Sequence, residues 1–176
     1  MRRVCYAVAM SLDGYIAGPN GEADWIIMDP DIDFRALFDR FDTFLLGRRT
    51  FEGMGGAGGR GQPGVQTIVF SRTLRQQDYP EVTIVSERLE RALADLRTKP
   101  GKDIWLFGGG SLFRSLLEAR QVDTVEVSVI PVLLGTGISL LPSTTSSERL
   151  KLTLTDSRTF KSGIVSLEYA VEDEAA

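Results

Sequence analysis

Residues 103–113 read DIWLFGGGSLF, an apolar run that ends in three glycines before a pattern typical of a helix. The run predicts a buried strand, and ligands of open α/β sheets bind beyond the carboxyl ends of such strands. Free N–H groups at a helix start attract anions, and glycine lets a phosphate approach the backbone. The stretch therefore indicates either a phosphate site or a tight turn without a ligand. It matches neither GxGxxG nor the P-loop, so neither fingerprint applies.

Strands and helices alternate along most of the chain around this stretch. Such alternation implies crossover helices and a largely parallel sheet, and two strands at the end suggest an antiparallel edge. The predicted fold class is α/β, with a mixed, mostly parallel sheet, antiparallel C-terminal strands and flanking helices. The expected strands are 4–10, 43–46, 67–70, 82–85, 103–107, 124–132, 150–156 and 164–171; the expected helices are 31–42, 111–120 and one capped by Ser86; 11–21 is an expected loop.

The composition is that of a globular protein without the usual catalytic side chains. The chain has 176 residues, 43% of them hydrophobic, and no linker or repeat, so we expect one domain over 1–176. A single Cys excludes an internal disulfide, and the absence of His excludes the common zinc sites and any His-dependent nucleophile, so no metal site is expected. Catalysis must then use carboxylates, hydroxyls, backbone dipoles or a borrowed cofactor.

The charge pattern is typical of a soluble protein. There are 20 basic and 24 acidic residues, a net charge of −4, which does not indicate nucleic-acid binding. No apolar run approaches the ~20 residues needed to span a membrane. The apolar stretch 4–10 is short for a signal peptide and lacks a convincing cleavage site, so we expect a cytoplasmic protein.

Two further strand ends carry groups suited to phosphate. Residues 46–51 (LGRRTF) place Arg48 and Arg49 after a glycine, and residues 69–73 (VFSRT) place a serine and another arginine after a strand. Guanidinium groups suit bidentate phosphate contacts, although two solvated arginines are the alternative. Taken with the three glycines, these strand ends predict one extended polyphosphate site.

Two other segments have an ordinary alternative to a functional interpretation. Residues 29–33 (DPDID) resemble the start of a calcium loop, but Phe34 replaces the required glycine and Arg40 the final glutamate, which excludes calcium binding. One of these carboxylates faces a ligand, or they are simply helix N-terminal charges. The glycine-rich stretch 53–64 is either a lid or, as we favour, a disordered surface loop.

Taken together, five segments resemble the dihydrofolate reductase-like family. The chain is similar in particular to the branch that includes the reductase domain of bacterial riboflavin-biosynthesis deaminase-reductases. The segments occur in the family's order and cover nearly the whole chain. They are SLDGYIAG at 11–18, GRRTFE at 47–52, FSRTL at 70–74, IWLFGGGSLFRSLL at 104–117 and VIPVLLGTGISLLP at 129–142.

The resemblance implies a three-layer α/β fold and NADPH as hydride donor. It also implies a cis peptide between the first two glycines of 108–110. Ala9 would present its backbone to the nicotinamide amide, and Ile16 would lie in the loop that covers the ring. The implied phosphate contacts are Gly47, Arg48, Arg49 and Thr50; Ser71 and Arg72 near the 2′-phosphate; and Gly108, Gly109, Gly110, Ser111 and Leu112 at the pyrophosphate.

On the substrate side, the resemblance implies a carboxylate on the helix after the first loop. Asp33 is the best match, with Asp31 one register away, and the family's later-strand hydroxyl falls at Ser128. The segment 129–142 favours the riboflavin-type branch over folate. Further expected substrate contacts are Trp25, Phe34 and Leu37.

The leading hypothesis is an NADPH-dependent reductase of a pterin, a pyrimidine such as 5-amino-6-(5-phosphoribosylamino)uracil, or a related heterocycle. One alternative is a non-catalytic nucleotide-binding protein that keeps the fold, and another is a stress- or antibiotic-related domain without a nucleotide. No nucleic acid or membrane partner is expected, and the apolar strand in 125–134 would suit a homodimer interface. A riboflavin-type role would require a separate deaminase.

Overall fold

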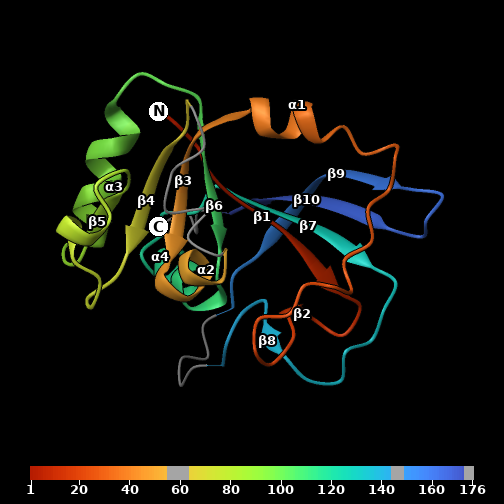
Figure 1. Cartoon of the computed structure of the whole chain (residues 1–176). Coiled ribbons are helices and arrows are strands. Elements are labelled where there is room, and N and C mark those ends of the chain that lie inside the picture. Colours follow the sequence, from red (N-terminus) through yellow and green to blue (C-terminus); the bar gives the residue numbers. More distant parts are fainter. Residues whose placement is uncertain (55–63, 144–148, 173–176) are drawn as a thin grey trace.

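We describe a computed structural model of the chain at residues 1–54, 64–143 and 149–172. Within these residues one sheet has the order β5-β4-β3-β6-β1-β7-β10-β9, and β2 pairs with β8 (Figure 1). Neighbours from β5 to β7 are parallel, and β10 and β9 are antiparallel, so the predicted sheet is confirmed. The strands are β1 (Val4–Ser11), β2 (Tyr15–Ala17), β3 (Phe41–Gly47), β4 (Gln66–Phe70), β5 (Thr83–Val85), β6 (Asp103–Gly108), β7 (Thr124–Ile130), β8 (Ile138–Ser139), β9 (Leu152–Thr159) and β10 (Val165–Val171).

Helices cover both faces of the large sheet, which gives three layers (Figure 1). Side chains alternate along β1. Val4 and Tyr6 pack with residues of α3 and α4, whereas Cys5 and Ala7 pack with residues of α1 on the opposite face. We call this opposite surface the α1 face. The helices are α1 (Phe34–Asp39), α2 (Arg48–Gly53), α3 (Leu89–Thr98) and α4 (Gly110–Glu118), with the short 3-10 helix η2 (Gln76–Asp78).

Aromatic packing anchors the centre of the α1 face. Trp105 of β6 is buried, and its Nε1 donates a hydrogen bond to the Ala7 carbonyl at 2.9 Å. The rings of Phe38, Phe41 and Phe44 lie 5.0–5.3 Å from the Trp105 ring, centroid to centroid. The interpretation of Trp105 as a packing residue is confirmed, as is that of Cys5, which is fully buried; burial raises the pKa of its thiol to about 11.

Several element boundaries differ from the sequence prediction; the strand expected at 150–156, for example, is Leu152–Thr159. The helix expected at 31–42 covers only Phe34–Asp39, because Asp33 caps its start and Phe41 enters the core as the first residue of β3. Ser86 does not cap the next helix, which begins at Leu89 after Arg88 in a left-handed conformation (φ +54°) without a side-chain cap. The strand expected to reach residue 132 ends at Ile130, before a proline that lacks an N–H donor.

The expected loop 11–21 contains a strand that local sequence did not reveal. Tyr15–Ala17 pairs with Ile138–Ser139, more than 120 residues further along the chain. The glycine-rich stretch 53–64 falls largely outside the described residues. In the parts of the chain that the structure describes, no helix is long and apolar enough to cross a membrane.

Candidate functional site

The carboxyl edge of the parallel strands brings the predicted phosphate-binding segments together. β3 lies between β4 and β6, with Leu46 paired to Gly108 and Gly47 paired to Phe70. Thr50, in the first turn of α2, lies against the glycines: a Cβ on Gly109 would meet Thr50 Oγ1 at 3.3 Å. The ends of three neighbouring strands therefore meet at one place, as the sequence predicted.

The three positions of the β6–α4 turn are occupied by glycine for different structural reasons. The peptide between Gly108 and Gly109 is cis, as predicted. Gly108 is buried and has a φ of +156°, a conformation that favours glycine, and a Cβ there would contact Thr50 at 3.5 Å. A Cβ on Gly110 would instead lie 2.6 Å from the Ser139 carbonyl oxygen. Gly110 is thus required by packing against the 138–142 segment, which the phosphate interpretation alone did not anticipate.

Helix α4 presents its N-terminus beside these glycines. Gly109 is its N-cap residue, and no side chain caps this end. First-turn N–H groups without a cap can bind an anion. Ser111 is exposed, whereas the Leu112 side chain is buried in the core cluster of α3 and α4, so Leu112 can contribute only its backbone to a ligand.

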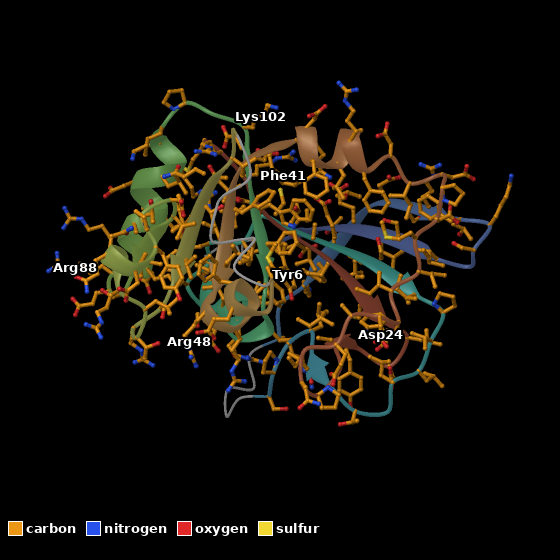
Figure 2. All side chains as sticks on the ribbon, in the orientation of Figure 1. Tyr6, Asp24, Phe41, Arg48, Arg88 and Lys102 are labelled. Atoms are coloured by element: carbon orange, nitrogen blue, oxygen red, sulfur yellow. The ribbon has the colours of Figure 1, made fainter. Side chains whose placement is uncertain are left out.

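Exposed guanidinium groups surround the same edge (Figure 2). Arg48 makes one contact of 3.4 Å with Glu52 in the next helical turn. Arg49 and Arg72 form no ion pair within the described residues. Such cations and an uncapped helix start beside a glycine-rich turn fit the phosphates of a dinucleotide.

The side chain of Ser71 has a structural role of its own. Its Oγ accepts hydrogen bonds from the N–H groups of Thr73 at 3.2 Å and Leu74 at 3.0 Å, and Ser71 is buried. These bonds form the turn that carries the exposed Arg72. Ser71 therefore fixes the position of its neighbouring guanidinium.

Asp13 joins the first loop to the segment after β7, a contact that the sequence analysis did not single out. Its carboxylate accepts hydrogen bonds from the Ser11 hydroxyl at 2.7 Å, the Gly135 N–H at 2.7 Å and the Leu134 N–H at 3.1 Å. These donors hold the pKa of Asp13 below its usual range. Ile16 lies half-buried in β2, so the loop that carries it is held at both ends.

The α1 face carries the expected substrate contacts. Ala9 of β1 pairs with Ser128 of β7, so these two residues are neighbours on this face. Trp25 packs in a cluster with Ala9, and Leu37 of α1 packs in the cluster of Cys5 and Ala7. Phe34 opens α1 and is half-buried. The structure therefore brings Trp25, Leu37 and Ser128 to one side of the sheet.

The two predicted carboxylates are both exposed, and that of Asp33 caps a helix. Asp33 is exposed, and its Oδ1 accepts a hydrogen bond from the Ala36 N–H at 2.9 Å, which caps α1. Asp31 is also exposed, and its N–H donates to Asp29 Oδ1 at 2.8 Å. The geometry favours the alternative of helix N-terminal charge, and a catalytic role of either residue stays a prediction.

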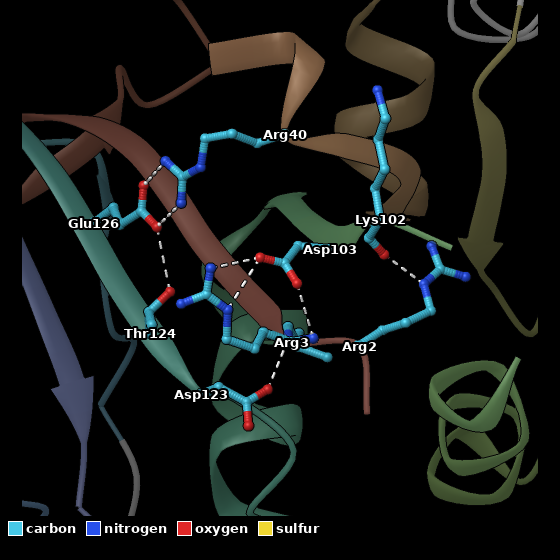
Figure 3. A network of polar contacts seen from close by, with 9 residues as sticks. Arg2, Arg3, Arg40, Lys102, Asp103, Asp123, Thr124 and Glu126 are labelled. Atoms are coloured by element: carbon cyan, nitrogen blue, oxygen red, sulfur yellow. Dashed lines mark hydrogen bonds and ion pairs between the residues drawn. The ribbon is translucent and has the colours of Figure 1, made fainter. Parts of the chain in front are cut away.

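A charged group that sequence reasoning missed lies on the same face. Both Nη atoms of Arg40 donate to the Glu126 carboxylate, at 2.8 and 2.6 Å (Figure 3). Glu168 of β10 stands directly opposite Glu126 in the sheet. Burial, followed by the charge of Glu126, raises the pKa of Glu168. The sequence feature that could have revealed this charged group is a glutamate within the apolar run TVEVSVI at 124–130. Among the described residues, no group of three or more His, Cys, Asp and Glu side chains could hold a metal ion.

The fold and this edge define an α/β protein of the reductase type, with a glycine-rich turn at a strand end. The chain belongs to the RibD C-terminal domain family, whose model matches residues 2–166. The uncharacterized protein YyaP of Bacillus subtilis (strain 168) is 36% identical over 180 residues, 96% of this chain and 94% of YyaP. The predicted membership of the riboflavin-type branch is confirmed.

Solved structures show the same fold. A putative riboflavin biosynthesis protein from Shewanella sp. PV-4 superposes with a TM-score of 0.79 at 27% identity, covering 98% of this chain and 100% of that one. Dihydrofolate reductase from Enterococcus faecalis, complexed with NADP(H), gives a TM-score of 0.70 at 22% identity, covering 97% of each chain. The predicted dihydrofolate reductase-like fold is confirmed.

Proposed function

We propose that the protein is an NADPH-dependent reductase that transfers hydride to a pterin, a pyrimidine or a related heterocycle. The observation that carries this proposal is the carboxyl edge, where the glycine-rich turn, an uncapped helix start and exposed guanidinium groups meet. Membership of the RibD C-terminal domain family supports it, as does the NADP(H) complex of a dihydrofolate reductase with the same fold.

The residues of this edge would hold the cofactor by its phosphates. In the proposal, Arg72 binds the 2′-phosphate from the turn that Ser71 forms, and α4 binds the pyrophosphate with its first N–H groups. Ala9 orients the nicotinamide, and the loop with Ile16 excludes water from it. When bound, NADPH supplies the hydride. The remaining proposed contacts are Gly47, Arg48, Arg49, Thr50, Gly108, Gly109, Gly110, Ser111 and Leu112.

The α1 face would hold the heterocycle. Ser128 offers a hydroxyl beside Ala9, and the apolar side chains of Trp25, Phe34 and Leu37 would cover the ring. Such a surface combines a few polar groups with apolar walls, as small-molecule sites do. The proposal keeps the cytoplasmic location and the homodimer that the sequence suggested.

Isothermal titration and an oxidation screen test this function. We expect saturable binding of NADPH, and oxidation of NADPH with at least one compound among dihydrofolate, a ribosylaminopyrimidine and simple quinones. NADH is the matched control, because it lacks the 2′-phosphate. No binding of NADPH at high micromolar protein would contradict the proposal.

A second candidate function is a nucleotide-binding protein without catalysis. It is favoured by the capping role of Asp33, since the carboxylate expected to serve the reaction is occupied and exposed. This candidate predicts NADPH binding without turnover of any heterocycle, and unchanged NADPH affinity in Asp33→Asn.

A further inference from the structure

We propose that Glu168 of β10 gives the proton to the heterocycle during its reduction, the role that the sequence had suggested for Asp33. This inference rests on the proposed reductase function. In the reaction, the carbon of a C=N or C=O bond takes the hydride of NADPH, and its π electron pair moves to the nitrogen or oxygen. That atom takes the proton from Glu168, which becomes a carboxylate and is reprotonated by solvent; NADPH becomes NADP⁺.

The sheet register places Glu168 beside the proposed substrate contacts. Ala9, Ser128 and Ser166 are neighbours on one row across β1, β7 and β10, while Glu126 and Glu168 occupy the adjacent row. Residues two apart on a strand point to the same face, with Cα atoms about 6.6 Å apart. A glutamate side chain on the second row can therefore reach a ring that lies over the first row.

The neighbouring carboxylate, that of Glu126, forms an ion pair with Arg40, but the Glu168 carboxyl has no such partner in the described residues. Arg40 donates both of its Nη atoms to Glu126, and Thr124 Oγ1 lies 3.3 Å from the same carboxylate. In the described residues, the Glu168 carboxyl makes no hydrogen bond and no ion pair. The Thr155 hydroxyl donates to the backbone carbonyl of Glu168, not to its side chain. Like charges directly opposite on two strands are destabilising. Because Arg40 is paired with Glu126, a proton on Glu168 relieves the repulsion between the two carboxylates.

The surroundings of Glu168 also favour its protonated form, because they raise its pKa. Its pKa is raised first by burial and then by Glu126, and Asp156 on β9 adds to this effect. Arg40 and Arg3 lower it, but the net shift is upward. Arg158 on β9 also lies on this face, with its guanidinium over the Phe160 ring. A carboxyl that keeps its proton nearer neutral pH is a better general acid.

Asp33 offers none of these features. Its carboxylate is exposed and already accepts the Ala36 N–H as the cap of α1. Glu168 is half-buried, and its carboxyl has no such donor in the described residues. The contrast makes Glu168→Gln and Asp33→Asn a matched pair, since each replaces one carboxyl by an amide of the same shape.

The experiment compares wild type, Glu168→Gln and Asp33→Asn with the best heterocycle from the oxidation screen. We expect Glu168→Gln to keep its NADPH affinity, to lose about 100-fold or more in kcat, and to lose the fall of kcat at higher pH. Asp33→Asn should keep kcat and its pH profile. A wild-type kcat and pH profile in Glu168→Gln would overturn the role of Glu168 alone.

A readout without substrate checks the protonation of Glu168 independently. Folding raises the pKa of Glu168, so above the ordinary pKa of a glutamate the folded chain keeps a proton that the unfolded chain releases. The free energy of unfolding therefore falls as the pH rises from the ordinary pKa through the raised one. Glu168→Gln should abolish this fall, measured by urea unfolding between pH 4 and 8. An unchanged pH dependence contradicts the inference. If wild type neither binds NADPH nor reduces a heterocycle, the proposed function fails and the role of Glu168 fails with it.

Discussion

The two edges of the parallel sheet carry arginines in opposite situations. At the amino edge, Arg2 is buried and donates to the Lys102 carbonyl at 2.5 Å (Figure 3). It also donates to Thr43 Oγ1 at 2.7 Å and forms an ion pair with Asp42. At the carboxyl edge, Arg49 is exposed and without an ion pair in the described residues. Similar side chains thus serve the fold at one edge and are free for a ligand at the other.

The amino edge is a network that joins strand starts. Arg3 contacts the Asp103 carboxylate at 2.7 and 3.0 Å, and Arg97 contacts Asp123 at 2.8 Å. Asp123 also accepts the Val4 N–H at 2.6 Å. These bonds link β1, β6, α3 and the start of β7. Cations that are already paired with carboxylates cannot bind phosphate without breaking such links, which agrees with the proposal of a phosphate site at the other edge.

The largest expected effect is on stability at the amino edge. Arg2→Met keeps the length of the side chain but removes the guanidinium that donates to Asp42, Thr43 and the Lys102 carbonyl. Arg2 is buried, whereas Asp42 is partly exposed and keeps the Lys102 N–H as a donor, so we expect a loss of about 2 kcal/mol in the free energy of unfolding. Urea unfolding measures it. A loss below 1 kcal/mol would mean that this network does not hold the fold, and NADPH affinity should be unchanged in the folded fraction.

At the carboxyl edge, we expect the effect on binding rather than on stability. Arg49→Ala should weaken NADPH and NADH about tenfold each, whereas Arg72→Ala should weaken NADPH about tenfold and leave NADH unchanged, because only NADPH has the 2′-phosphate. Isothermal titration with both cofactors measures the difference. Both variants should unfold within about 0.5 kcal/mol of wild type, since neither arginine is buried. Equal losses for the two cofactors in Arg72→Ala would remove that residue from the 2′-phosphate site.

The smallest effect is expected for an exposed pair on α1. Arg35 on α1 lies 3.9 Å from Asp39 and is 92% exposed. Such pairs contribute little, so Arg35→Ala should change the free energy of unfolding by less than about 0.5 kcal/mol and leave cofactor affinity unchanged. A larger change would show that net charge, not position at an edge, explains the results for Arg49 and Arg72.

Local patterns in the chain were sufficient for most strands and for the glycine-rich turn. The apolar runs at 4–10 and 103–107 became β1 and β6 with nearly the expected bounds, because continuous apolar residues suit strands that are covered on both faces. The cis peptide at Gly108–Gly109 followed from the family resemblance. These features depend on residues close together in the chain, and a sequence displays them directly.

Long-range partners decided the rest. Asp33 became a helix cap because α1 begins three residues later than its periodicity suggested, and Tyr15–Ala17 became a strand only because Ile138–Ser139 lies beside it. Glu168 stands opposite Glu126 through a register that joins residues 42 positions apart. Composition and local pattern could indicate a borrowed cofactor and its phosphate-binding turn, since a turn is built from neighbours in the chain. The proposed role of Glu168 rests instead on strand pairing and burial, which arise only when distant segments pack together.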